Sequence, residues 1–183
     1  FKDNYSEDSI NIFSSDFIIK DTSFINTKSD ALDVDFSIGL IENSIFENVG
    51  NDAIDISGSK VTALNINING SGDKAISAGE ASKLIANNIS IKNSNIGIAS
   101  KDLSLVKAKN LNFETTKYCY AAYQKKPEYG PGTIRIERGD TLKIKINSST
   151  NCSSYLLEKN SNIIHVDKKF RHNYANLRDL LYP

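Results

Sequence analysis

The sequence predicts an all-β fold, a right-handed parallel β-helix with about 22 residues per coil. Three observations predict it: serines recur at a nearly constant interval, an apolar column and a small-residue column keep the same interval, and apolar and polar residues alternate within each repeat. The composition agrees, because isoleucine, asparagine and serine are abundant while proline is scarce, which favours short strands joined by tight turns.

Three columns of residues set the register of the repeat. The serine column is Ser15, Ser37, Ser59, Ser82 and Ser104, the apolar column is Phe24, Phe46, Ile68, Ile91 and Phe113, and the small-residue column is Ala31, Ala53, Ala75, Gly97 and Cys119. Every step is 22 residues except one step of 23, which falls at the same coil in the first two columns. Asn26, Asn48 and Asn93 follow the apolar column and mark a turn. The agreement of the columns predicts coils stacked directly on one another.

Each coil contains a segment in which apolar and polar residues alternate, as in residues 32–36, 54–57 and 76–79. This period of two indicates strands rather than helices. Strands this short bury their apolar side only against neighbouring coils, so Leu32, Ile54, Ile76 and Ile98 are expected in one inward ladder.

The β-helix is expected over residues 1–169, with a loop near 124–132 where Pro and Gly interrupt the pattern. Strands are expected to resume at 133–137, 141–146, 155–159 and 162–166. Residues 170–183 place Tyr174, Leu177 and Leu181 on one helical face, which predicts a short helical cap over the open end of the solenoid. The chain starts at Phe1 and lacks Met, so we expect it to be part of a longer protein with further domains.

Charge and cysteine content narrow the function classes. Lys plus Arg and Asp plus Glu both number 22, so no net charge favours nucleic acid or anionic membranes. No apolar stretch is long enough to span a bilayer, and we expect no membrane insertion. Cys119 and Cys152 form either two free thiols or one disulfide, and they lack zinc-site spacing.

Acidic residues recur at the coil interval. Asp8, Asp30, Asp52 and Lys74 are 22 residues apart, and Asp33, Asp55 and Ser77 occupy the outward positions of the next strand. Carboxylates stacked about 4.8 Å apart repel by roughly 3.5 kcal/mol at an effective dielectric near 20. Two interpretations follow. Either these are solvated turn residues with an Asp52–Lys74 surface ion pair, or Asp30, Asp33, Asp52 and Asp55 bind calcium.

The same segments carry a family resemblance. The runs Ser29-Asp30-Ala31-Leu32-Asp33, Asn51-Asp52-Ala53-Ile54, Asp73-Lys74-Ala75-Ile76 and Gly97-Ile98-Ala99-Ser100-Lys101 resemble the successive motifs of the polygalacturonase family. Asp30, Asp52 and Lys101 match family positions. Asn51 replaces one carboxylate of the water-activating pair, Lys74 replaces a histidine and Ala99 replaces an arginine. Because an inverting hydrolase needs a carboxyl acid and a separate carboxylate base, these departures argue against hydrolysis.

The acids with a nearby lysine are similar instead to calcium-dependent pectate lyases, whose lysine removes the C5 proton of a uronate. This resemblance implies calcium as cofactor, Lys74 or Lys101 as base, and Asp52 in the catalytic set. A bound cation would lower the pKa of the lysine toward neutrality.

The sequence leads to three functional hypotheses. The first is a carbohydrate-binding module that holds an acidic polysaccharide along the Asp and Lys face, with Asp30, Asp35, Tyr123 and Lys125 contacting sugar. The second is a calcium-dependent lyase, and the third is a structural spacer. Resemblance to β-helix repeat proteins implies a secreted or surface-exposed bacterial protein that handles polysaccharide, and the zero net charge gives no reason to expect nucleic acid as a partner.

Overall fold

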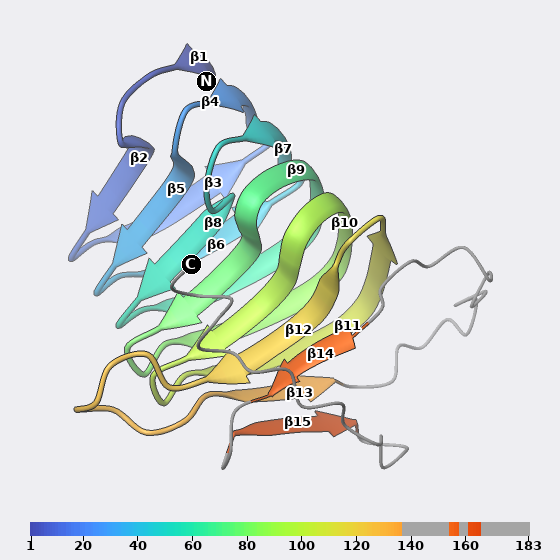
Figure 1. Ribbon diagram of the computed structural model, residues 1–183. Helices are drawn as coiled ribbons and strands as arrows, with labels where there is room; N and C mark the ends of the chain where they lie inside the picture. The colour runs from blue at the N-terminus through green and yellow to red at the C-terminus, as the bar shows by residue number, and fades with distance from the viewer. Residues whose placement is uncertain (137–153, 158–160, 166–183) are drawn as a thin grey trace.

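The computed structural model describes residues 1–136, 154–157 and 161–165, all of which belong to a right-handed parallel β-helix of about six turns. Figure 1 shows the strands of successive coils lying side by side along the axis of the solenoid. Every strand pair among the described residues is parallel, and the coils of residues 8–114 contribute to three sheets. The expected fold class is confirmed. The expected strand at 141–146 and the helical cap at 170–183 lie outside the described residues.

We number the sheets in the order that a coil visits them. Sheet 1 contains β2 (Asp8–Phe13), β5 (Asp30–Asp35), β8 (Ile54–Ser57), the C-terminal parts of β9 (Lys60–Gly79) and β10 (Lys83–Lys101), β12 (Tyr118–Tyr123) and β14 (Ser154–Leu157). Sheet 2 contains β3 (Asp16–Lys20), β6 (Ile38–Glu42), the N-terminal parts of β9, β10 and β11 (Leu105–Glu114), β13 (Thr133–Ile136) and β15 (Asn162–His165). Sheet 3 contains β1 (Lys2–Asn4), β4 (Ser23–Thr27), β7 (Ile45–Val49), the middle of β9 and β10, and the end of β11.

The core is a set of stacked apolar columns. Leu32 pairs with Ile54, Ile54 with Ile76 and Ile76 with Ile98, and all four are 0% exposed. In sheet 3, Phe24 and Phe46 stack with ring centroids 4.8 Å apart. Both predicted columns are therefore confirmed. They stabilise the fold because each coil buries the apolar side of its neighbours.

Ladders of serine and asparagine side chains form hydrogen bonds between coils at the corners that join the sheets. In the serine column each backbone N–H donates to the hydroxyl of the next coil, for example Ser37 N to Ser59 Oγ at 2.9 Å and Ser59 N to Ser82 Oγ at 3.0 Å. At another corner Asn65 Nδ2 donates to Asn43 Oδ1 at 2.9 Å, and Asn88 Nδ2 donates to Asn65 Oδ1 at 2.7 Å. These asparagines have positive φ, which asparagine tolerates better than most residues. Repetition at the coil interval thus makes the turns as regular as the strands.

The C-terminal coils differ from the earlier ones. Residues 124–132 form the expected loop between β12 and β13, and Asp102 Oδ1 accepts hydrogen bonds from the backbone N–H groups of Lys125 and Lys126, at 2.6 and 2.7 Å. Tyr120 occupies the core position of the isoleucine ladder and meets Phe113 edge to face. Cys119 is disulfide-bonded, so the alternative of one disulfide holds and that of two free thiols does not. Cys152 is the other cysteine of the sequence. Among the described residues, no helix is long and apolar enough to cross a membrane.

Candidate functional site

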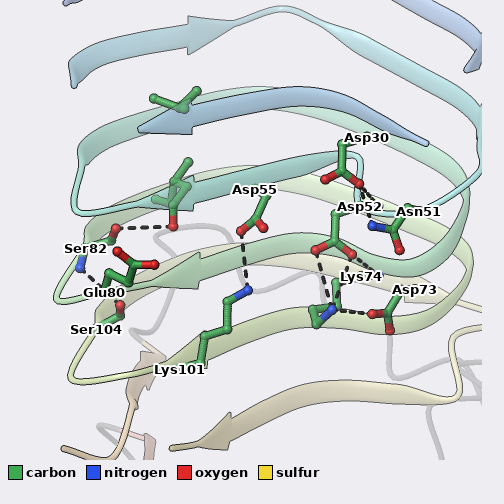
Figure 2. Close-up of polar contacts among 12 residues, drawn as sticks. Asp30, Asn51, Asp52, Asp55, Asp73, Lys74, Glu80, Ser82, Lys101 and Ser104 are labelled. Carbon is green, nitrogen blue, oxygen red and sulfur yellow. Dashed lines mark hydrogen bonds and ion pairs between the residues drawn. The ribbon is translucent and has the colours of Figure 1, made fainter. Parts of the chain in front are cut away.

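The outer side of sheet 1 gathers the charged residues that the sequence predicted to lie together. Asp8 pairs with Asp30, Asp33 with Asp55, and Asp55 with Ser77 in the strand register. Figure 2 shows the acids and lysines of successive coils pointing toward one another on this face. We call Asp30, Asp33, Asp52, Asp55, Asp73, Lys74 and Lys101 the sheet 1 cluster. Carboxylates one coil apart do occupy one side of the molecule, as the spacing predicted.

Asp52 and Lys74 form the buried part of the sheet 1 cluster. Lys74 Nζ lies 3.5 Å from both carboxylate oxygens of Asp52, and it also pairs with the carboxylate of Asp73. The backbone N–H of Lys74 donates to Asp52 Oδ1 at 2.8 Å. Asp52 is 2% exposed and Lys74 is 8% exposed. The expected ion pair is present, but its placement on the surface was wrong, because both side chains are almost fully covered by neighbouring residues.

Asp30 is held by the turn that precedes β8. Asn51 Nδ2 and the backbone N–H of Asp52 donate to Asp30 Oδ1 at 2.7 and 2.8 Å. The same arrangement recurs one coil later with Asp52 and the N–H of Lys74. These carboxylates therefore act as caps for the neighbouring coil.

Lys101 reaches Asp55 across an intervening coil. Lys101 Nζ lies 3.6 Å from Asp55 Oδ1, and that oxygen is buried without a hydrogen-bond donor among the described residues. The lysine side chain passes over Gly79, where an added Cβ would stand 2.9 Å from Lys101 Cε. Gly79 thus leaves the space that lets Lys101 contact an acid two coils away.

Burial and neighbouring charges shift the pKa values of the cluster. Burial raises the pKa of Asp52 to about 7, although Lys74 and Lys101 act in the opposite direction. Burial alone would lower the pKa of Lys74, but the adjacent carboxylates of Asp52 and Asp73 outweigh it and raise that pKa. Lys74 is therefore a stable cation in this arrangement. A base that works near neutral pH needs the opposite shift.

Asp33 stands at the more open, N-terminal end of the cluster. Burial, together with the like charges of Asp35 and Asp55, raises the pKa of Asp33 to about 7. Because the pKa is above the ordinary 3.8, the folded state binds this proton more tightly than the unfolded chain does. The stability contribution is fully present below the unfolded pKa and is lost as pH rises through the folded pKa.

We therefore expect the melting temperature to fall as pH rises from about 5 to about 8, and to fall less steeply in Asp33→Asn. The neutral amide keeps the shape of the side chain but has no proton to lose. Thermal unfolding followed by circular dichroism across this pH range measures both slopes. Equal slopes in the two proteins would contradict the assignment.

The other residues predicted to contact sugar lie in three different surroundings. Asp35 lies next to the cluster in β5, with partial exposure and a pKa raised mainly by burial. Tyr123 is 1% exposed and belongs to an apolar patch on the same side of sheet 1, formed with Ile96, Ala99, Tyr118 and Ala121. Its ring is not open to a sugar in this structure. Lys125 is exposed in the loop, where its backbone N–H is bound by Asp102.

Two contributors were missed from the sequence. Asp73 pairs with Lys74 although the two are adjacent in the chain, an arrangement that period-two alternation does not suggest. The sequence predicts Gly79 only as a strand residue, since the path of a side chain from the next coil leaves no signal in the sequence. Among the described residues, no group of three or more acidic, histidine or cysteine side chains has a geometry suited to a metal ion.

Comparisons with protein-family models, curated proteins and solved structures find no match to this chain. The parallel β-helix itself rests on the strand pairing described above. The similarity to polygalacturonases and pectate lyases rests on the short sequence motifs alone.

Proposed function

We propose that this chain is a polysaccharide-binding β-helix module that holds its ligand along the outer side of sheet 1. The observation that carries the proposal is the in-register pair Asp33 and Asp55, whose carboxylates are partly exposed on the outer side of this sheet. Sugar hydroxyls are donors of the kind that such oxygens accept. A rigid parallel sheet also holds these acceptors in fixed positions, which lowers the entropic cost of binding.

The charge of the cluster decides how an acidic polysaccharide would bind there. Five carboxylates and two lysines share the face, so a uronate chain would be repelled without a cation between the two sets of carboxylates. Calcium suits this role because it accepts six to eight oxygen ligands. We propose that it binds together with the sugar, with Asp33 and Asp55 supplying the protein ligands.

Retention on an affinity gel containing polygalacturonate tests the proposal. We expect calcium to slow the migration of the wild-type protein and excess EDTA to remove the effect. Asp33→Asn/Asp55→Asn should abolish the calcium-dependent retardation. The control is Asp16→Asn/Glu47→Gln, which changes the charge equally on sheets 2 and 3. Calcium-dependent retention that survives in the sheet 1 variant would reject this face.

A lyase activity is the second candidate, and one observation favours it. Among the described residues, Lys101 pairs with one carboxylate, that of Asp55, whereas Lys74 is held as a cation by two carboxylates. The base of an elimination would therefore be Lys101. The unsaturated product of an elimination absorbs in the ultraviolet. Ultraviolet absorbance that grows with calcium and disappears in Lys101→Ala would show that the protein is a lyase and not only a binding module.

We also propose a secreted or surface location. The disulfide at Cys119 supports it, because disulfides persist mainly in oxidising compartments. A protein that binds extracellular polysaccharide would work in the same place.

A further inference from the structure

The outer side of sheet 2 carries a strip of cations in its later coils. Lys60 pairs in register with Lys83, and Lys107 pairs in register with Arg135. Lys109 lies on the same side, next to Asn87 in the register. Lys60, Lys83, Lys107 and Arg135 are exposed. We call these five residues the basic face.

The basic face has no acidic partner among the described residues. The other outward positions of these strands hold Thr62, Leu64, Ile85, Asn87, Leu105 and Thr133, none of which is acidic. None of the five cations takes part in an ion pair within the part of the chain that the structure describes. Like charges one strand apart repel each other, so this arrangement weakens the fold without a compensating contact.

Two other stacked pairs on the exterior of the solenoid combine opposite charges. Lys20 lies across from Glu42 in sheet 2 with 2.8 Å between charged atoms, and Lys92 lies across from Glu114 in sheet 3 with 2.7 Å. In both pairs a cation faces an acid one coil away. The like-charged pairs Lys60–Lys83 and Lys107–Arg135 depart from this pattern, which indicates a surface kept for an external anion.

The geometry favours a linear ligand that crosses the strands at a slant to the solenoid axis. The cations come from β9, β10, β11 and β13, which lie side by side in Figure 1, so the strip crosses the strands instead of following one of them. Parallel strands are about 4.8 Å apart, so the strip advances one strand at a time, and Lys107 and Arg135 lie two residues further along their strands than Lys60 and Lys83 do. A chain with an anionic group on each repeat fits this spacing.

We propose that the basic face binds an acidic polysaccharide directly, through carboxylate or sulfate groups and without a metal ion. Thr62 and Asn87 offer hydrogen-bonding groups for hydroxyls between the charges. Single-stranded nucleic acid fits less well, because such ligands use aromatic platforms and the outward positions of these strands contain no aromatic residue. The basic face lies on a different sheet from the Asp33–Asp55 pair, so this inference does not depend on the function proposed above.

Binding to immobilised polygalacturonate in EDTA tests this inference, with neutral dextran as the uncharged comparison. We expect Lys83→Gln/Lys107→Gln to weaken binding roughly tenfold at low ionic strength, and added salt to weaken the wild type in the same way. The matched control Lys20→Gln/Lys92→Gln removes the same charge elsewhere and should change affinity less than about twofold. The basic-face variant should melt no lower than the wild type, because a repulsion has been relieved.

Each result separates this inference from its rivals. Equal losses in the two lysine variants would show that only net charge matters, and no wild-type binding in EDTA would reject the basic face. Tighter binding of an oligodeoxythymidine of equal charge, or of vesicles containing phosphatidylserine, would overturn the choice of ligand. Asp33→Asn/Asp55→Asn should bind normally in EDTA even if the calcium-dependent site on sheet 1 proves real.

Discussion

Asp52→Ala is expected to lower the free energy of unfolding by about 3 kcal/mol, because it leaves a buried lysine with one fewer counter-charge. Lys74 Nζ would lose two oxygens at 3.5 Å, and the backbone N–H of Lys74 would lose its acceptor at 2.8 Å. Asp73 still pairs with Lys74, which places the loss at the low end of the range for broken buried pairs. Urea denaturation followed by circular dichroism measures the change.

Two comparisons isolate the cause. Glu42→Ala breaks the Lys20–Glu42 pair, whose side chains are 49% and 25% exposed, and should cost less than about 1 kcal/mol. Asp52→Leu/Lys74→Met removes both charges at once and should destabilise less than Asp52→Ala, because no buried charge is then left unpaired. A loss in Asp52→Ala no greater than that in Glu42→Ala would mean that the pair is effectively solvated.

Phe46→Ala is expected to cost about 3–5 kcal/mol, since it opens a cavity in the middle of a stacked column. Phe46 is 0% exposed, stacks on Phe24 and pairs with Ile68 in the next coil. A solenoid has only contacts between adjacent coils, so a gap in one coil weakens both interfaces that it forms. Thermal and urea unfolding of the same protein measure the loss.

Phe13→Ala provides the matched control. Phe13 is 64% exposed and meets Phe36 edge to face at the outer surface. Its removal should change the free energy of unfolding by less than about 1 kcal/mol. If Phe13→Ala and Phe46→Ala lost similar stability, the core would not be organised as stacked columns.

Most of the fold could be predicted because the repeat is local and regular. The serine, apolar and small-residue columns each keep the coil interval, and an interval shared by three residue types fixes which strands lie side by side. Alternation then settles which side of each strand faces inward, as Leu32 and Asp33 illustrate. The grouping of Asp30, Asp52 and Lys74 followed from the same register.

The chemistry of the candidate site was less predictable. The spacing placed Asp52 and Lys74 together but gave no measure of burial, which depends on what packs over an outward position. As a result a surface pair was expected where a buried one exists, and the spacing gave no sign that the adjacent carboxylates raise the pKa of Lys74. The reach of Lys101 over Gly79 to Asp55 depends on a missing side chain in an intervening coil.

The sequence by itself determined the coil length, the parallel register and the identity of the stacked columns, because these follow from periodic residue types. Only the tertiary structure decided how deeply the charges are buried and which cations lie together on sheet 2. Lys60 and Lys83 are 23 residues apart, and Lys107 and Arg135 are 28 residues apart, the second step being lengthened by the loop at 124–132. Strand pairing restores the alignment that the insertion hides, since hydrogen bonds between coils set the register whatever the length of the loop between them.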